Sequence, residues 1–484
     1  MQFYLREKEL KQLVNVVDDK HQESKFIIVS GSRKVGKTTL VNTLVKQKNG
    51  IYITISAKSS SMQLNDISDY LREINPPGTF IPRFENWKHL FEYFFMLAHE
   101  KSVIVVLDEF HNLCNIDSDV FIDFRTVWDI HASKSKLCLI SVTYDLNFIK
   151  MNFHNEDSPL YRIMNFSLRL TPFTLIDVIS LFKLNKSNIP INEIIDLYIV
   201  FGGYPKYYHL FDLFNLWDKN LQEILRILVF QAYAPLANEL NDIIINLFTR
   251  ENKVYISVLQ SIALNNHTIT HIADSINIKA TTLSKYLLEL EKKKHIIKRK
   301  QPINVSYVEN SKFGMYYISS YFENFWFRFI QPDIISFENG QYDRMLQNIS
   351  QNFDEYRKQR IPLVIRELMQ YSKEIENLNA IFPYDVTSVG SLWNRKKMVD
   401  IVAINDEKKK LLLGSVYTGN STMKVETINE LFSTMTEFEK QFVGYEIRKV
   451  LFHNSTISLD LWNQLKDKNQ NIFSYSKLLK QIYD

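Results

Sequence analysis

The residues of this chain that are best suited to chemistry lie between and just after two glycines. Residues 31–38 read GSRKVGKT and match the pattern G-x-x-x-x-G-K-[ST]. Glycines suit such a loop because its backbone N–H groups must turn inward around phosphates, and a Cβ atom would obstruct that turn. Lys37 would contact the β- and γ-phosphates, and Thr38 would bind Mg²⁺ through its hydroxyl group. The residues that we expect to bind the triphosphate are Gly31, Ser32, Arg33, Lys34, Val35, Gly36, Lys37, Thr38 and Thr39.

A second polar site follows the apolar run at residues 103–107, where Asp108 and Glu109 stand side by side. Asp108 would complete the Mg²⁺ site with Thr38, and Glu109 would orient or deprotonate the attacking water. The same pair could be an ordinary solvated turn. The catalytic candidates are therefore Lys37, Asp108 and Glu109, and the metal candidates are Thr38 and Asp108.

These side chains must be positioned by strands and helices. Residues 25–30, 103–107 and 137–142 are apolar runs of strand length, and helical stretches separate them. This alternation predicts an α/β fold with a parallel sheet that is covered on both faces. The third run ends in Ser141-Val142-Thr143, where a polar side chain could sense the γ-phosphate or be a plain strand-end hydroxyl.

Composition limits the remaining classes. The chain has 484 residues, of which 45% are hydrophobic and 23% charged, with a net charge of +4. This length predicts about three domains, and the composition excludes disordered and collagen-like chains. Two cysteines and no apolar run of about 18 residues favour a cytoplasmic protein without a disulfide framework or a membrane span.

Three further segments add a family resemblance. Residues 3–10 read FYLREKEL, residues 159–162 read PLYR and precede TPF, and residues 202–207 read GGYPKY. Together with the phosphate loop and the strand before Asp108, they resemble the archaeal-type ATPases of the STAND branch of AAA+-related P-loop proteins. The resemblance covers roughly residues 1–210.

The resemblance implies ATP and Mg²⁺ as ligands and a slow ATPase that acts as a conformational switch. It implies that Phe3 and Arg6 lie near the adenine and that the turn ending at Pro205 closes over the nucleotide. Arg162 occupies the position of a family glycine, and Ile163 that of a family arginine, which leaves no clear phosphate sensor there.

Residues 251–315 contain three predicted helices and a basic stretch, which is typical of a winged helix. In such a domain the polar start of the third helix and the basic stretch would contact DNA. The alternative is a winged helix that packs inside the protein or binds another protein. The DNA-contact candidates are Thr281, Thr282, Ser284, Lys285, Lys298, Arg299 and Lys300.

The C-terminal third resembles an uncharacterised domain that often follows this ATPase and looks like the PD-(D/E)xK nuclease fold. Asp400 matches the first carboxylate, but Ser415 and Tyr417 replace the glutamate and lysine, and Ile361–Pro362 replaces the helix glutamate. A single carboxylate cannot hold a catalytic metal, so we expect an inactive domain in which residues 398–404 and 410–417 pair as strands. Otherwise Asp400 would simply pair with a neighbouring cation at residues 395–397.

We therefore expect a P-loop ATPase core (1–175), a helical lid (176–250), a winged helix (251–315) and a nuclease-like domain (316–484). The leading hypothesis is an ATPase whose nucleotide state controls DNA or partner binding. The alternatives are an ATP-regulated DNA-processing nuclease, a nucleotide- or DNA-binding regulator without turnover, and a partner-binding regulator.

Overall fold

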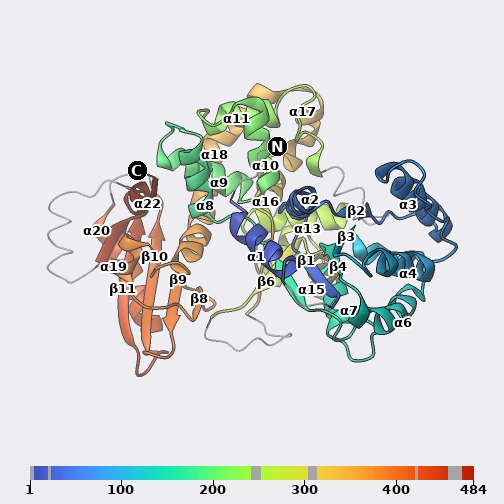
Figure 1. The fold of residues 1–484 in the computed structure, drawn as a ribbon. Coiled ribbons are helices and arrows are strands. Elements are labelled where there is room, and N and C mark those ends of the chain that lie inside the picture. Colours follow the sequence, from blue (N-terminus) through green and yellow to red (C-terminus); the bar gives the residue numbers. More distant parts are fainter. Residues whose placement is uncertain are drawn as a thin grey trace. The chain divides into compact units, whose positions relative to one another are not determined.

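In the computed structural model, apolar segments of the N-terminal part of the chain form a parallel sheet of five strands (Figure 1). The sheet has the order β2-β3-β4-β1-β5 and confirms the predicted α/β class. Its strands are β1 (Lys25–Ser30), β2 (Ile51–Thr54), β3 (Val103–Asp108), β4 (Leu137–Thr143) and β5 (Phe166–Arg169).

Both faces of this sheet are buried, which explains why its strands are continuous apolar runs. In β1, Phe26 and Ile28 belong to one core and Ile27 and Val29 to the other. The helices α1 (Glu7–Val17) and α2 (Lys37–Lys48) contribute to the second core. The first core is completed by α3 (Ser60–Ile74), α4 (Trp87–Leu97), α5 (Leu113–Ile116), α6 (Val120–His131) and α7 (Leu146–Phe153).

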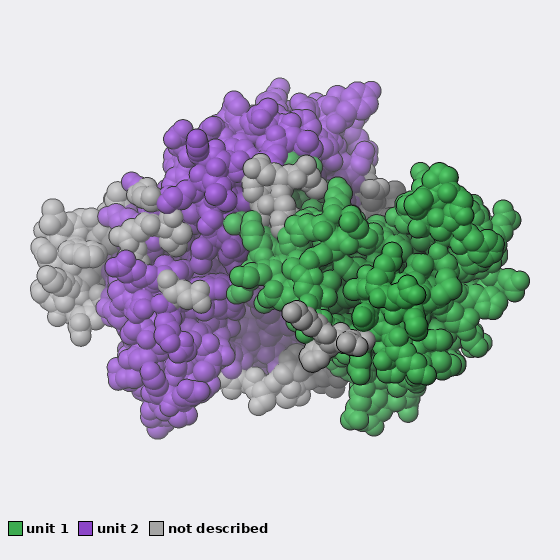
Figure 2. All heavy atoms as spheres, viewed as in Figure 1, with its two compact units in different colours: residues 1–172, 204–209 green, residues 173–203, 210–484 purple. Residues whose placement is uncertain are grey.

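The structure describes residues 5–19, 23–240, 252–303, 313–373, 375–419, 423–455 and 471–483. Two units divide the chain, and Figure 2 shows them in different colours. Unit 1 comprises Met1–Pro172 and Tyr204–His209, and unit 2 comprises Phe173–Gly203 and Leu210–Asp484. Within the described residues, no helix has both the length and the apolar character needed to cross a membrane.

Unit 2 begins with helices that pack through aromatic side chains. Phe201 at the end of α9 stacks on Phe322 of α16 with 5.7 Å between the ring centroids. Trp326 of α16 is fully buried, so the aromatic run of this segment is core. The helices of this part are α8 (Leu175–Leu184), α9 (Ile191–Phe201), α11 (Leu221–Leu228), α16 (Tyr321–Phe329) and α17 (Ile334–Glu338). Helix α10 (Pro205–Phe214) begins in unit 1 and continues into unit 2 from Leu210.

Three helices and a hairpin occupy the segment where a winged helix is expected. Thr268 caps the second helix by accepting a hydrogen bond from the His271 N–H at 3.2 Å. The strands of the hairpin are antiparallel. The elements are α13 (Asn252–Ala263), α14 (Ile269–Ser275), α15 (Ala280–Leu288), β6 (Ile297–Lys300) and β7 (Met315–Ile318).

A separate mixed sheet of five strands, in the order β12-β11-β10-β9-β8, forms the C-terminal part. β9 and β10 are antiparallel, as predicted for residues 398–404 and 410–417, whereas β10 and β11 are parallel. The strands are β8 (Ser388–Trp393), β9 (Met398–Asn405), β10 (Lys410–Tyr417), β11 (Glu446–His453) and β12 (Asn471–Ser474). The helices are α18 (Tyr342–Met369), α19 (Glu376–Ile381), α20 (Val425–Glu439) and α22 (Tyr475–Tyr483).

Candidate active site

The loop between β1 and α2 depends on its glycines. Gly36 caps α2 with a left-handed backbone at φ 88°. A Cβ atom on Gly31, whose φ is 146°, would lie 2.4 Å from the carbonyl oxygen of Leu170. Both positions therefore require a residue without a side chain. Helix α2 begins at Lys37, directly after this loop, and the N-terminus of a helix favours an anion.

Lys37 is buried against its own loop. Its Nζ donates hydrogen bonds to the carbonyl oxygens of Gly31 at 2.8 Å and Ser32 at 2.9 Å. Burial lowers the pKa of Lys37, while the charges of Glu109 and Asp108 act in the opposite direction. The ammonium group is thus held at the phosphate loop rather than in solvent.

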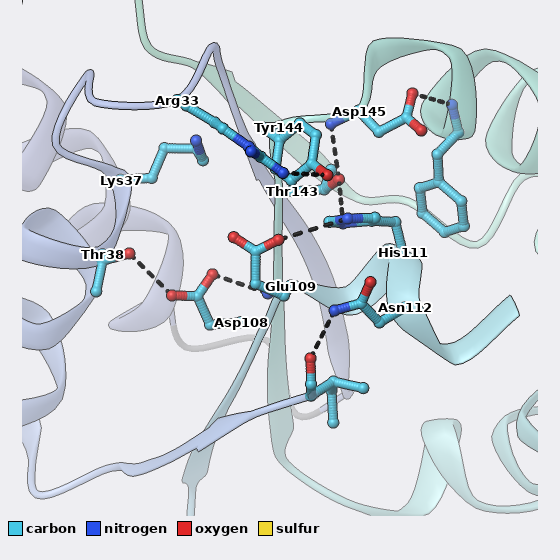
Figure 3. A network of polar contacts seen from close by, with 12 residues as sticks. Arg33, Lys37, Thr38, Asp108, Glu109, His111, Asn112, Thr143, Tyr144 and Asp145 are labelled. Carbon is cyan, nitrogen blue, oxygen red and sulfur yellow. Dashed lines mark hydrogen bonds and ion pairs between the residues drawn. The ribbon is translucent and has the colours of Figure 1, made fainter. Parts of the chain in front are cut away.

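The two predicted metal ligands are in contact. The Thr38 hydroxyl donates a hydrogen bond to Oδ2 of Asp108 at 2.9 Å (Figure 3). The same oxygen accepts a hydrogen bond from the Tyr52 hydroxyl at 2.5 Å, and Oδ1 accepts from the Glu109 N–H at 2.8 Å. A hydroxyl and a carboxylate are the hard oxygen donors that Mg²⁺ prefers, so this pair fits the metal that the loop implies.

Glu109 has an unusual backbone. Its φ is 55°, a left-handed conformation that is uncommon for residues other than glycine and is often found at functional sites. Burial and the charge of Asp108 raise the pKa of Glu109. This carboxylate lies 3.4 Å from Nε2 of His111, and Figure 3 shows it between Asp108 and His111.

His111 joins Glu109 to the end of β4. Its Nδ1 lies 3.1 Å from the hydroxyl oxygen of Thr143, which also accepts the Asp145 N–H at 3.0 Å. Burial lowers the pKa of His111, which favours the neutral imidazole at neutral pH. Of the two candidate sensors, Thr143 is therefore linked to Glu109 through His111, whereas Ser141 donates to the carbonyl oxygen of Ile27 at 3.3 Å within the sheet.

The sequence interpretation missed His111 and Tyr52. His111 lies two residues after Glu109, which is a weak signal, and Tyr52 lies on the neighbouring strand β2 with no motif around it. Their roles become visible only when β2, β3 and β4 are placed side by side.

The other loop residues take different positions. Arg33 is exposed, donates to the Tyr144 hydroxyl at 2.7 Å and lies 4.1 Å over that ring (Figure 3). Val35 is buried in the core behind the loop, and Lys34 has a φ of 71°. The carbonyl oxygen of Thr39 accepts the Thr43 hydroxyl at 2.9 Å inside α2.

Arg6 is tied to the phosphate loop from α1. Its buried guanidinium donates to the carbonyl oxygens of Thr171 at 2.5 Å and Val35 at 3.4 Å, and pairs with Glu9 at 2.7 Å. Phe3 lies outside the described residues.

Pro205 also lies beside the loop. A Cβ atom on Gly36 would be 3.9 Å from the Cγ atom of Pro205. Pro205 belongs to unit 1, whereas Gly203 belongs to unit 2. The chain therefore enters the unit of the phosphate loop at the GGYPKY segment and leaves it again after His209.

Arg162 is exposed and has a φ of 59°, which explains a glycine at this position in the family pattern. It lines a small cavity with Glu23, Arg125 and Asp129, and no phosphate-loop residue lines that cavity. The structure therefore does not bring Arg162 to the loop.

The C-terminal sheet places Asp400 opposite Ser415. Oδ2 of Asp400 accepts the Val416 N–H at 2.9 Å. Burial raises the pKa of Asp400, and Arg366 of α18 opposes that shift. Within the described residues, no group of three or more histidine, cysteine, aspartate or glutamate side chains could hold a metal ion. Asp400 forms no ion pair with residues 395–397, and Lys397 instead pairs with Glu437 at 2.7 Å.

The predicted DNA-contact residues divide into two sets. Those on α15 are exposed, while Leu283 and Leu287 face the core. In β6, Lys298 and Lys300 line a cavity, and Arg299 between them does not. Strand alternation causes this split, because successive side chains point to opposite faces. The exposed residues of α15 are Thr281, Thr282, Ser284 and Lys285.

Comparisons with known proteins agree with the geometry of unit 1. Residues 3–211 match an ATPase domain family found predominantly in Archaea, and residues 326–429 match a family of archaeal and bacterial proteins of unknown function. An uncharacterized protein of Methanocaldococcus jannaschii is 28% identical over 417 residues, which cover 86% of this chain and 87% of that protein.

Two solved structures are similar to this chain over part of its length. The Walker-type ATPase of Pyrococcus abyssi is 18% identical with a TM-score of 0.48, and the match covers 67% of this chain and 96% of that one. The ORC2 protein of Aeropyrum pernix, in ADPNP and ADP complexes, is 12% identical with a TM-score of 0.44, and the match covers 72% of this chain and 95% of that one.

Proposed function

We propose that this chain binds Mg·ATP at residues 31–38 and hydrolyses it slowly as a conformational switch. The match of residues 3–211 to an ATPase domain family found predominantly in Archaea supports the proposal. The observation that carries the proposal is the 2.9 Å contact between Thr38 and Asp108, which joins the phosphate loop to the end of β3. A triphosphate bound by the loop would therefore lie next to both carboxylates of the acidic pair.

In this proposal each residue has one task. Lys37 stabilises charge on the β- and γ-phosphates, and Glu109 orients the attacking water and accepts its proton. Thr38 and Asp108 would hold Mg²⁺, which neutralises charge on the phosphates when bound. His111 positions Glu109 and connects it to Thr143. Arg6 and Pro205 hold the loop from either side.

The switch is proposed from the path of the chain. Pro205 lies beside Gly36, while the residues before Tyr204 and after His209 belong to unit 2. A shift of Pro205 on nucleotide binding is passed along the backbone to α9 and α10. A switch of this kind needs a nucleotide that binds two arrangements with different affinity.

What the switch controls is proposed from α15. Its exposed hydroxyls and Lys285 suit phosphate and base-edge contacts of a winged helix. Binding through so few charged contacts would be weak and sensitive to salt. We therefore assign DNA binding under nucleotide control to unit 2, with a protein partner as the alternative occupant of this face.

A phosphate-release assay tests the ATPase proposal. Glu109→Gln should keep ATP affinity and lower turnover by roughly 10²–10⁴-fold, the usual contribution of a general base. Lys37→Ala should abolish ATP binding in calorimetry. Undiminished turnover in Glu109→Gln would refute the assignment, and ATP binding by the wild type without phosphate release would favour a regulator without turnover.

A low-salt gel shift tests the DNA proposal. Lys285→Glu should weaken binding of a duplex, whereas Lys358→Glu, a charge reversal at an exposed lysine of α18, should leave it unchanged. Equal binding by the two variants would favour the protein partner.

A further inference from the structure

A cavity of about 480 Å³ in unit 2 has a strongly cationic wall. It lies between the hairpin β6–β7, the helix α18 and the strand β8. The cationic side chains that line it are Lys298, Lys300, Arg360 and Arg366.

The acidic side chain in this lining is engaged elsewhere. Glu367 accepts the Leu175 N–H at 2.9 Å and the Tyr198 hydroxyl at 2.8 Å. Among the described residues, none of the four cations forms an ion pair with a carboxylate. The charge of Glu367 still acts on Lys298, and that of Asp400 acts on Arg366, whereas the charges that act on Lys300 are those of the three other cations.

The side chain of Arg360 gives the strongest indication that the cavity binds an anion. Its side chain is buried, with 5% of its surface exposed, and its Nε has no hydrogen-bond partner. The guanidinium lies 4.4 Å over the ring of Tyr321 and donates no hydrogen bond to any described residue. A buried guanidinium without an acceptor is costly, so a native site of this kind calls for an anion.

The other cations of the cavity lie close enough to influence one another electrostatically. Arg366 is held in place, since it donates to the carbonyl oxygen of Pro362 at 3.1 Å and to the Ser391 hydroxyl at 2.9 Å. Burial and the charges of Arg366, Lys298 and Arg360 lower the pKa of Lys300 to about 7. An anion in the cavity would relieve this repulsion.

We propose that the cavity binds a small phosphate-bearing molecule of about nucleotide size. A single carboxylate would bring only one negative charge to several cations. A phosphate group offers two charges and several acceptor oxygens that suit the guanidinium fork. The volume lies within the range of small-molecule sites, and Tyr317, Tyr321 and Leu363 supply apolar surface for the rest of the ligand. A concave site between three elements fits a small molecule better than a duplex.

Titration calorimetry with inorganic tripolyphosphate tests this site in the Lys37→Ala full-length chain, in which the phosphate loop is disabled. One equivalent should bind. Adding Lys300→Gln and Arg360→Gln should weaken that binding by at least about tenfold, because each removes a charge-assisted contact. Adding Lys293→Gln, which removes an exposed charge outside the lining, should change nothing.

Several outcomes would overturn the proposal. The proposal is wrong if tripolyphosphate does not bind to Lys37→Ala, or if it binds equally to the cavity and control variants. It is also wrong if citrate binds as tightly as tripolyphosphate, or if duplex DNA displaces tripolyphosphate at equal phosphate concentration. Lys300→Gln alone, which keeps the buried Arg360, provides the same comparison if the double substitution lowers the melting temperature. These results do not depend on ATP turnover, so they separate this site from the proposed ATPase.

Discussion

At the scale of single residues, the acidic pair is held by neighbours that the phosphate-loop motif does not contain. Asp108 accepts hydrogen bonds from Thr38 and Tyr52, and Glu109 lies against His111. In the proposed mechanism, the orientation of the Glu109 carboxylate toward a water molecule therefore depends on its contact with His111. The histidine is a positioning residue in this interpretation, since its contacts are with Glu109, Thr143 and the rings of Tyr144 and Phe148.

Replacing His111 tests that role. His111→Ala should lower kcat by about tenfold to a hundredfold while ATP affinity stays the same, because small displacements of a catalytic group are costly. The pH profile of kcat should also shift, since the imidazole borders Glu109. His89→Ala, at an exposed histidine of α4, is the control, and equal kinetics for the two variants would contradict a positioning role.

A second residue-scale prediction concerns pH. Because the pKa of Lys300 lies at about 7, its charge is present below that pH and lost above it. Tripolyphosphate also gains negative charge as the pH rises, so the Lys37→Ala chain is compared with the same chain carrying Lys300→Gln. Between about pH 6 and about pH 8, affinity should fall in the Lys37→Ala chain relative to that variant. Calorimetry of both chains provides the comparison, and an identical pH dependence would contradict the assignment. The titratable or charged groups that face Lys300 are Lys298, Tyr317, Arg360, Arg366 and Glu367.

At the scale of elements, the phosphate loop is shaped by the contact of its first glycine with the end of β5. The carbonyl oxygen of Leu170, just after β5, would lie 2.4 Å from a Cβ atom at Gly31. The same φ range occurs at Gly78, where a Cβ atom would meet nothing within 4 Å. A substitution would therefore strain the backbone at either glycine, but only at Gly31 would the new side chain also collide with a neighbour.

Substituting each of these two glycines by alanine distinguishes the effect of backbone strain from that of a steric clash. Gly78→Ala should cost about 1–2 kcal/mol of stability and leave ATP affinity unchanged, because only the left-handed backbone is penalised. Gly31→Ala should in addition lower ATP affinity by about tenfold or more, since the loop must move away from Leu170. Thermal unfolding and ATP calorimetry of both variants provide the comparison, and unchanged affinity in Gly31→Ala would refute this account of the loop.

At the scale of the whole molecule, the segment 204–209 belongs to one unit and its neighbours in the chain to the other. Amide hydrogen exchange can show whether nucleotide binding in unit 1 alters the neighbouring segments of unit 2. ATP should change amide exchange in α9 and in the part of α10 after His209 as well as around the loop in the wild type, and should change neither in Lys37→Ala. Changes confined to unit 1 would contradict the proposed switch.

The sequence by itself determined the phosphate loop, the acidic pair and the alternation of strands and helices in unit 1. These features are local, because a glycine-containing turn, the end of a strand and a run of apolar residues each depend on residues that are adjacent in the sequence. The same holds for the paired strands on either side of residues 405–409.

Only the tertiary structure decided which distant side chains meet. Tyr52 reaches Asp108 because β2 and β3 are neighbours, and His111 reaches Thr143 because β3 and β4 are neighbours. The cationic cavity is a stronger case, since β6 and α18 supply its charges from segments with no shared motif. A basic stretch indicates charge, but strand alternation and packing determine which of its residues face a solvent-exposed surface and which face a cavity.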